Sequence, residues 1–209
     1  MSKYIHILQT NLSNLQSINY AIDRLGYKVN QTTSINSLKS DDILVIPGVG
    51  NFKQAMQNIQ PNLSTLKEKI RNNEIKILGI CLGMQLLFSH SEEGNVNGLD
   101  IIKGNVEKLQ KIGIKKVPNI GWRKVVFNEK EFLRFNGEYF YFVHSYFGNP
   151  ENDKNTLGHM YINNNKISSF VTNEDSKIGN YIGTQFHPEK SGKVGLEFLE
   201  LLLRKLDDL

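Results

Sequence analysis

One cysteine lies in a context that suits a catalytic nucleophile. Cys81 stands in Gly79-Ile80-Cys81-Leu82-Gly83, after an aliphatic stretch and before a segment with helical spacing. Glycines two positions before and after a nucleophile let the backbone turn sharply from strand to helix, which lifts the side chain out of the sheet. A thiol there also lies at a helix N-terminus, which favours the thiolate. The N–H of Leu82 would point into the same space as an oxyanion donor.

A structural role is the alternative for this cysteine. Free cysteines are most often buried and inert, and glycines can flank one by chance. The strand, the paired glycines and the helix start together favour the nucleophile. Because Cys81 is the only cysteine, the chain can form neither an internal disulfide nor a cysteine-based zinc cluster.

A thiolate nucleophile needs a base and a group that orients the base. His187 ends an apolar run in Gly183-Thr184-Gln185-Phe186-His187-Pro188-Glu189, and the carboxyl ends of parallel strands meet at one edge of a sheet. Glu189 could accept a hydrogen bond from the imidazole and fix its tautomer. Alone, His-Pro-Glu would also suit a surface turn. Of the other histidines we expect His6 to be packed, and His90 and His159 to be surface or structural.

A second pair of glycines follows another aliphatic stretch, in Pro47-Gly48-Val49-Gly50. Glycines allow a backbone N–H to approach a ligand closely, so this segment is a candidate second oxyanion element. By itself it suits an ordinary turn at a strand end. No Gly-Lys-Ser/Thr follows, which argues against a phosphate loop.

The apolar pattern indicates which elements hold these motifs. Short aliphatic strands alternate with amphipathic helices in the first half, which is typical of a largely parallel sheet covered on both faces. We expect strands at 4–8, 27–30, 43–46 and 75–80, with helices at 14–25, 52–59, 63–71 and 82–88. Beyond about residue 94 we expect strands at 103–109, 122–127, 139–143, 158–161, 166–171 and 181–186, and a last helix at 193–206. The predicted fold is one α/β domain over 1–209, a three-layer sandwich with additional antiparallel strands in its second half.

Composition limits the class of protein. Of 209 residues, 39% are hydrophobic and 22% charged, with a formal net charge of +4 spread as single lysines. This pattern is typical of a globular protein without a nucleic-acid partner. No His/Asp/Glu cluster has ligand spacing, so we expect no metal and no cofactor. No apolar run reaches about 18 residues and the N-terminus lacks a signal-peptide pattern, so we expect a cytoplasmic protein with no membrane contact.

Three motifs together resemble the Cys-His-Glu triad class of glutamine amidotransferases. They are Pro-Gly-Val-Gly at 47–50, Gly-Ile-Cys-Leu-Gly-Met-Gln at 79–85 and Phe-His-Pro-Glu-Lys-Ser at 186–191, and their order and spacing cover nearly the whole chain. Finer features are similar to the glutaminase subunits of imidazole glycerol phosphate synthases, which serve histidine biosynthesis. These features lie at 47–52, 81–88, 91–93, 117–122, 141–146 and 187–192.

The resemblance implies hydrolysis of glutamine to glutamate and ammonia. Cys81 would attack the side-chain amide, His187 would move the proton and Glu189 would orient His187, through a glutamyl thioester. Gln85 and Glu93 match positions that hold the α-amino and carboxylate ends of the substrate. Further matches are Gly50 and Leu82 at the oxyanion positions, and His144, Ser145 and Tyr146 along the same pocket.

The resemblance also implies a heterodimer, in which ammonia passes to a (β/α)8-barrel synthase subunit that makes imidazole glycerol phosphate and AICAR. Tyr141 and Lys190 match the interface near the ammonia exit, and we expect Asn119, Trp122 and Arg123 on the same partner-facing side. Asn119 and Arg123 depart from the family, which has His and Asn there, and Asn11-Leu12-Ser13-Asn14 departs from its Gly-x-Gly-Asn turn. A guanidinium buried at an interface needs a partner group, so we expect the synthase subunit to place a carboxylate opposite Arg123.

Three alternatives stay open at this point. A paralogous glutaminase that supplies ammonia for amidino groups of surface sugars, with another synthase, has a very similar sequence. A cysteine hydrolase or peptidase of similar fold would share the elbow and a histidine, but Gln85 and Glu189 argue against it. A non-catalytic regulatory subunit would be expected to have lost Cys81, His187 or Glu189, and none is lost.

Overall fold

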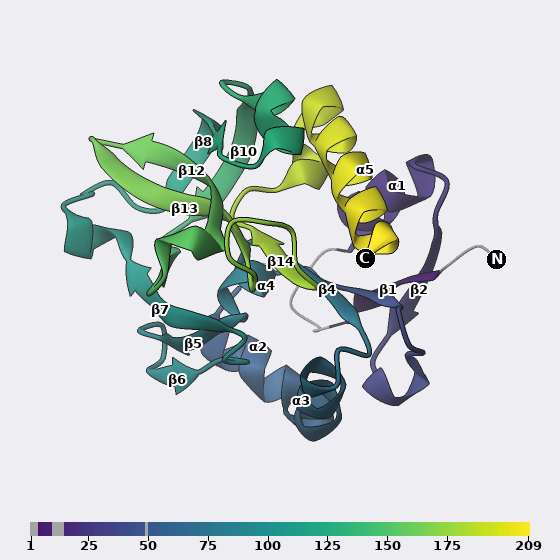
Figure 1. Cartoon of the computed structure of the whole chain (residues 1–209). Coiled ribbons are helices and arrows are strands. Elements are labelled where there is room, and N and C mark those ends of the chain that lie inside the picture. The colour runs from purple at the N-terminus through teal and green to yellow at the C-terminus, as the bar shows by residue number, and fades with distance from the viewer. Residues whose placement is uncertain (1–3, 10–14, 49) are drawn as a thin grey trace.

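A computed structural model describes residues 4–9, 15–48 and 50–209. An eight-stranded sheet forms its centre, in the order β2-β1-β3-β4-β14-β13-β12-β9 (Figure 1). The parallel strands are β1 (Tyr4–Leu8), β2 (Lys28–Thr32), β3 (Ile43–Ile46), β4 (Lys76–Ile80) and β14 (Tyr181–Thr184). The antiparallel strands are β13 (Asn165–Thr172), β12 (Thr156–Ile162) and β9 (Val126–Phe127). The departure noted at 11–14 lies outside the described residues.

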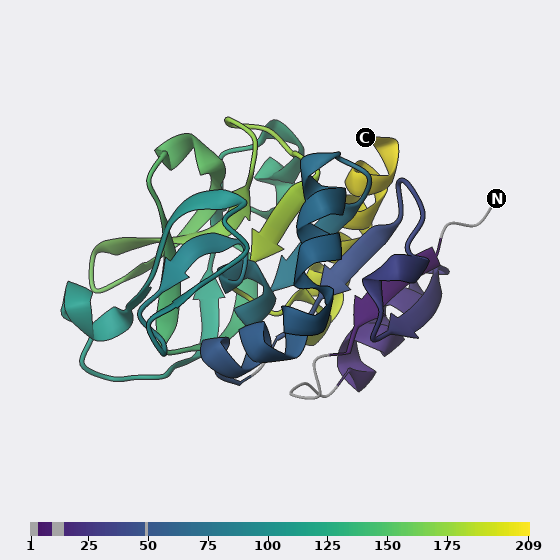
Figure 2. The same ribbon diagram turned by 90° about the horizontal axis from the view of Figure 1, so that it is seen from below.

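Helices cover both faces of this sheet, as Figures 1 and 2 show. One face packs against α1 (Gln16–Arg24) and α5 (Gly192–Asp208), and the other against α2 (Phe52–Ile59) and α3 (Leu63–Arg71). Each helix buries one apolar stripe, for example Ile18, Ala21 and Ile22 of α1. The expected three-layer α/β sandwich is therefore confirmed.

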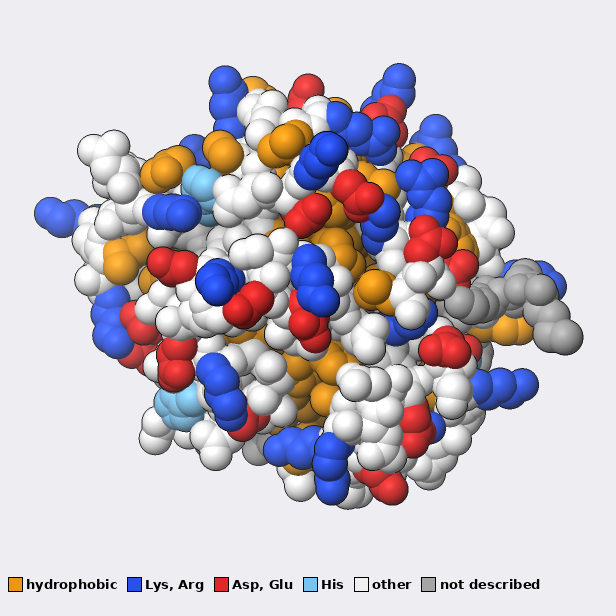
Figure 3. Space-filling model, in the orientation of Figure 1, with side chains coloured by type: hydrophobic (Ala, Val, Ile, Leu, Met, Phe, Trp, Pro, Cys, Tyr) orange, Lys and Arg blue, Asp and Glu red, His pale blue; other side chains and the backbone are white. Residues whose placement is uncertain are grey.

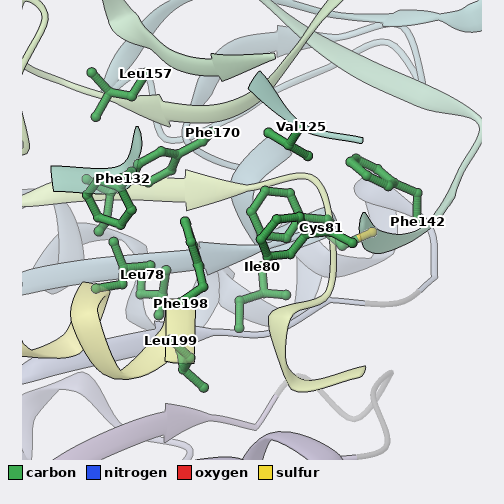
Figure 4. Packing of buried hydrophobic residues seen from close by; sticks show 14 of the residues in the cluster. Leu78, Ile80, Cys81, Val125, Phe132, Phe142, Leu157, Phe170, Phe198 and Leu199 are labelled. Carbon is green, nitrogen blue, oxygen red and sulfur yellow. The ribbon is translucent and has the colours of Figure 1, made fainter. Parts of the chain in front are cut away.

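Aromatic side chains fill the α5 side of the core. Phe198 of α5 lies 5.3 Å from Phe127 and 5.1 Å from Phe132 between ring centroids, and all three rings are almost fully buried. Figure 4 shows this packing and places Cys81 at its edge, near Phe142. The nucleophile candidate therefore stands on a closely packed base, which limits its movement.

Two smaller sheets complete the chain. One contains β5 (Phe88–Ser91), β6 (Val96–Asn97), β7 (Ile102–Lys108) and β11 (Tyr146–Pro150), and the other pairs β8 (Asn119–Lys124) with β10 (Tyr139–His144). Short 3-10 helices are η1 (Ile35–Ser37), η2 (Gln60–Asn62), η3 (Leu109–Ile112), η4 (Lys130–Phe135), η5 (Asp153–Asn155) and η6 (Pro188–Lys190).

The helix expected over 82–88 is wrong in length. It is the single turn α4 (Leu82–Gln85), and Phe88 already belongs to a strand in which it pairs with Ile102. Leu86, Leu87 and Phe88 are all buried, and a continuous apolar run has no period that distinguishes helix from strand. The strand expected over 122–127 is likewise divided between β8 and β9, which belong to different sheets.

Three loops that leave the central sheet at adjacent carboxyl ends carry the candidate motifs. The chain leaves β3 at Pro47, β4 at Cys81 and β14 at Gln185. β4 lies between the other two strands, with Gly79 beside Ile46 and Ile80 beside Thr184.

In the described part of the chain, no helix has the length and apolar content needed to cross a membrane. Acidic and basic side chains are intermixed on the face seen in Figure 3.

Candidate active site

The backbone at Cys81 is strained in the way a nucleophile elbow requires. Cys81 has φ 55° and ψ −106°, and its N–H donates to the Thr184 carbonyl at 2.7 Å. A positive φ in a residue with a Cβ costs free energy and is concentrated at functional sites. A Cβ on Gly83 would lie 1.7 Å from the Ile46 carbonyl oxygen. Glycine at this position therefore allows α4 to pack against the end of β3.

The sulfur of Cys81 has two polar neighbours besides His187. Cys81 is 6% exposed, and its thiol donates to the Val143 carbonyl at 3.8 Å. The Gln185 amide Nε2 donates to Sγ at 3.6 Å. The Val143 carbonyl can therefore accept a hydrogen bond only from a thiol, whereas the Gln185 amide can donate one to a thiol or to a thiolate.

His187 and Glu189 form a buried pair. His187 Nδ1 lies 2.8 Å from Glu189 Oε1, and the two side chains are 3% and 7% exposed. Because a carboxylate only accepts, Nδ1 carries the proton and donates it, and Nε2 is left for the sulfur side. Nε2 is buried and has no hydrogen-bond partner in the described chain. Burial lowers the pKa of His187, but Cys81 and Glu189 raise it more, to about 10.

Backbone contacts hold His187 against β10. The His187 N–H donates to the Tyr141 carbonyl at 2.9 Å, and the Ser191 hydroxyl donates to the His187 carbonyl at 2.6 Å. The same hydroxyl accepts from the Tyr141 N–H at 2.9 Å. The loop after β14 is therefore joined to β10 on both sides of the histidine.

A cavity of about 220 Å³ opens beside Cys81. It is smaller than the sites that take drug-sized ligands, which have roughly 300–1,000 Å³, and its size suits an amino acid. Eight residues singled out in the sequence line it: Gly50, Cys81, Leu82, Gln85, Glu93, His144, Ser145 and Tyr146. Gly48, Pro118 and Val143, which belong to the same sequence motifs, complete the lining.

Two side chains present acceptors to this cavity. Gln85 Nε2 donates to the Tyr146 carbonyl and to Gln185 Oε1, each at 3.0 Å, so its own oxygen is the end available to a ligand. Glu93 Oε2 accepts from the Phe52 N–H at 2.8 Å, at the start of α2. The second carboxylate oxygen of Glu93 can therefore receive a cationic group.

His144 forms one wall of the cavity and is held from both sides. Nδ1 donates to the Tyr146 carbonyl at 2.8 Å, and Nε2 accepts from Asn119 Nδ2 at 2.9 Å. Burial lowers the pKa of His144 to about 4, so the ring is neutral at pH 7. Arg123 Nε and Nη2 donate to Asn119 Oδ1 at 3.1 and 3.0 Å.

The expected position of Asn119 therefore needs a correction. We expected Asn119 on the partner-facing surface, but it is 4% exposed and bonds to His144. Arg123 is exposed, and the neutral Asn119 oxygen that accepts from it does not neutralise the guanidinium, so the expected carboxylate opposite Arg123 stays a prediction. Asn119 is buried because the pleat of β8 turns alternate side chains to opposite faces, so that it points away from the face of Ile120 and Trp122.

The other residues expected near the partner lie close to His187 or to Tyr141, which contacts it. Trp122 is 50% exposed and meets Tyr141 edge to face at 5.9 Å, and the Tyr141 ring lies 6.5 Å from the His187 ring. Lys190 is exposed on η6, and its N–H donates to the His187 carbonyl at 3.1 Å. Ile120 and Tyr139, 57% and 50% exposed, extend this surface.

The remaining histidines lie elsewhere. His6 is buried, as expected, with Nε2 3.1 Å from Asp42 Oδ2. His90 Nε2 bonds to Asn95 Oδ1 at 3.1 Å, and His159 is buried in β12. Among the described residues no group of three His, Cys, Asp or Glu side chains is arranged to hold a metal ion.

Sequence reasoning missed Gln185, which contacts the sulfur. The available signal was a glutamine inside an apolar run, two residues before His187 and therefore on the same side of an extended backbone.

The sequence matches the glutamine amidotransferase class-I family over residues 2–205. Solved structures with the same fold include a glutamine amidotransferase (TM-score 0.72, 13% identity, covering 98% of this chain and 100% of that one). Another is PurLQS from Thermotoga maritima (TM-score 0.74, 18% identity, covering 99% and 100%). The chain belongs to the class I glutamine amidotransferases.

Comparison with curated relatives identifies the family within this class. The imidazole glycerol phosphate synthase subunit HisH of Haemophilus influenzae is 39% identical over 206 residues, covering 97% of this chain and 98% of that protein. The protein of the same name from Methanocaldococcus jannaschii is 42% identical over 205 residues, covering 94% and 96%. Within the class, the chain belongs to the HisH family.

Proposed function

We propose that this chain is the glutaminase subunit of an imidazole glycerol phosphate synthase, acting in histidine biosynthesis as one glutamine amidotransferase domain over 1–209 in the cytoplasm. The observation that carries the proposal is the meeting of a strained cysteine, a buried His–Glu pair and an amino-acid-sized cavity. Membership of the HisH family favours histidine biosynthesis over the amidino-sugar pathway.

The first chemical step is acylation of Cys81. With its pKa raised to about 10, His187 is protonated at pH 7 and can act as the acid, while Cys81 reacts as the thiolate. The thiolate attacks the side-chain amide carbon of glutamine, and the carbonyl electrons move to oxygen. His187 Nε2 then gives its proton to the amide nitrogen as the C–N bond breaks, so ammonia leaves and a glutamyl thioester remains.

The second step is hydrolysis of the thioester. His187, now neutral, takes a proton from water as the oxygen attacks the thioester carbon. The C–S bond breaks, glutamate is released, and Cys81 returns to the thiolate beside the imidazolium. Glu189 keeps Nδ1 protonated through both steps, so that Nε2 is always the atom that exchanges the proton.

The cavity residues hold the substrate and its developing charge. Glu93 pairs with the α-ammonium group of glutamine, and the oxygen of Gln85 accepts from the same end of the substrate. Ser145 and Tyr146 line the site beside them, and neutral His144 fixes the Tyr146 carbonyl. The backbone N–H groups of Leu82 and Gly50 donate to the oxyanion, which is worth about 3–4 kcal/mol of barrier per donor in comparable sites.

The synthase subunit, a (β/α)8 barrel, docks on the surface formed by Ile120, Trp122, Tyr139, Tyr141 and Lys190. Exposed aromatic side chains at the centre of a patch are typical of protein interfaces. This surface adjoins His187, where ammonia is released. Passage of ammonia directly into the partner keeps it neutral and nucleophilic, because ammonia in water at pH 7 is mostly ammonium.

Substitution of the nucleophile tests this proposal. Cys81→Ala in complex with the synthase subunit should lose glutamine-dependent product formation and retain formation from ammonium salts at raised pH. Wild-type complex is the control for both nitrogen sources. Retained glutamine-dependent activity would reject Cys81 as nucleophile, and loss of both activities in an intact complex would reject the division of labour.

A further inference from the structure

Gln185 lies against the nucleophile, although the reaction described above gives it no task. It follows β14 directly and is fully buried. Its Nε2 is 3.6 Å from Cys81 Sγ, and its Oε1 is 3.0 Å from Gln85 Nε2. A buried amide costs free energy unless both ends are bonded, and here one of the two bonds is made to the reacting atom.

The neighbours of Gln185 determine which end of its amide faces the sulfur. The Tyr146 carbonyl can only accept, so Gln85 presents its NH2 group to it. The second N–H of that group points at Gln185, which must therefore present its oxygen to Gln85. This leaves the NH2 group of Gln185 facing Sγ, whatever the protonation state of the thiol.

We propose that Gln185 is a catalytic residue that donates a hydrogen bond to Cys81 and stabilises the thiolate. The inference rests on the proposed role of Cys81 as nucleophile. The Val143 carbonyl, 3.8 Å from Sγ, accepts from a thiol and repels a thiolate. A donor on the sulfur offsets that preference, since hydrogen bonds to the charged form of a group favour that form.

Gln185 also joins the nucleophile to a substrate-holding residue. Its oxygen receives one of the two N–H groups of Gln85, the side chain whose own oxygen faces the cavity. Loss of the Gln185 amide should therefore reduce the thiolate fraction and loosen Gln85. The two effects are measured separately, as the pH dependence of thiol reactivity and as the KM for glutamine.

The test compares Gln185→Met with wild type by iodoacetamide labelling of the full chain without glutamine. Cys81 is the chain's only cysteine, so the labelling rate reports one sulfur. We expect the midpoint of the pH–rate profile to move about one pH unit to the alkaline side, a tenfold smaller thiolate fraction, as for a lost charged hydrogen bond. Glutaminase kcat/KM of the complex at neutral pH should fall about tenfold.

Ser169→Ala is the matched control. Ser169 is equally buried, its carbonyl accepts from the Gln185 N–H at 2.9 Å, and its hydroxyl donates to the Ile167 carbonyl. Its labelling midpoint should stay at the wild-type value. An unshifted midpoint in folded Gln185→Met, or an equal shift in Ser169→Ala, would overturn the proposal.

Gln185→Asn keeps the proposal testable if Gln185→Met does not fold. It retains a polar amide but is one methylene shorter, which withdraws the donor from Sγ, so the alkaline shift should persist. An unshifted midpoint in this variant would also overturn the proposal. Labelling needs no turnover, so a failure of this inference is distinct from a failure of the proposed function, which active Cys81→Ala would reveal.

Discussion

Replacing Glu189 with glutamine isolates the charge of the carboxylate beside His187. The pair is 2.8 Å apart and both side chains are buried. A glutamine oxygen can accept from Nδ1 in the same place, so the ring keeps its orientation and only the charge is lost. The new NH2 group takes the position of Oε2, which is buried without a hydrogen-bond partner in the described chain.

The geometry gives the size of the effect. A hydrogen bond to a charged group is worth about 1.5–3 kcal/mol and a neutral one about 0.5–1.5 kcal/mol. The difference, about 1–1.5 kcal/mol, corresponds to a loss of roughly tenfold in kcat/KM. His187→Ala removes both proton transfers and should cost about 10²–10⁴-fold.

The pH dependence of glutaminase activity in Glu189→Gln provides an independent check of the His187–Glu189 pair. Activity requires the imidazolium, so it is lost as pH rises through the pKa of His187, which stands at about 10. Glu189 raises that pKa, and its neutralisation must therefore move the alkaline limb to lower pH. By the estimate above the movement is about one pH unit.

Steady-state glutamate release by the complex, measured between about pH 6 and 11, is the assay for both effects. The kcat/KM of Glu189→Gln should lie between the values for wild type and for His187→Ala. An alkaline limb that stays in place in folded Glu189→Gln would refute the assigned pair, and so would a loss as large as that of His187→Ala.

Three further substitutions test other parts of the account. Gly83→Ala places a Cβ 1.7 Å from the Ile46 carbonyl oxygen and should lower the free energy of unfolding by about 3 kcal/mol, measured by urea denaturation; an unchanged value would contradict the close packing of α4. Asn119→Leu removes the hydrogen bond to His144 Nε2, which leaves that buried nitrogen unbonded at a cost of about 1–3 kcal/mol. Because His144 forms a wall of the cavity, this variant should raise the KM for glutamine several-fold with a smaller change in kcat. Trp122→Ala should weaken binding of the synthase subunit at least tenfold, or about 1.4 kcal/mol, in a calorimetric titration; equal affinity would place the interface elsewhere.

Much of the architecture could be predicted because its signals are local. The bounds of α2 and α3 coincide with the ranges 52–59 and 63–71 that their apolar spacing predicted. The elbow was predictable for the same reason, because the glycines that relieve its clashes lie only two residues from Cys81 in the chain.

The contacts that complete the site depend on pairings far apart in sequence. Gln185 meets Cys81 because β14 lies beside β4 with Ile80 opposite Thr184, a register that no local pattern specifies. Asn119 was expected at the surface because the resemblance placed it with Trp122 on the partner-facing side. Its burial follows from the position of His144, which β10 brings opposite it.

The most direct test of the central claim is mass spectrometry of the complex quenched in acid during glutamine turnover. Wild-type chain should gain the mass of one glutamyl group, and fragmentation should place it on Cys81. The adduct should disappear after mild base or hydroxylamine, which cleave thioesters, and it should be absent from Cys81→Ala. A glutamyl group on any other residue, or turnover by Cys81→Ala at the wild-type rate, would contradict the account.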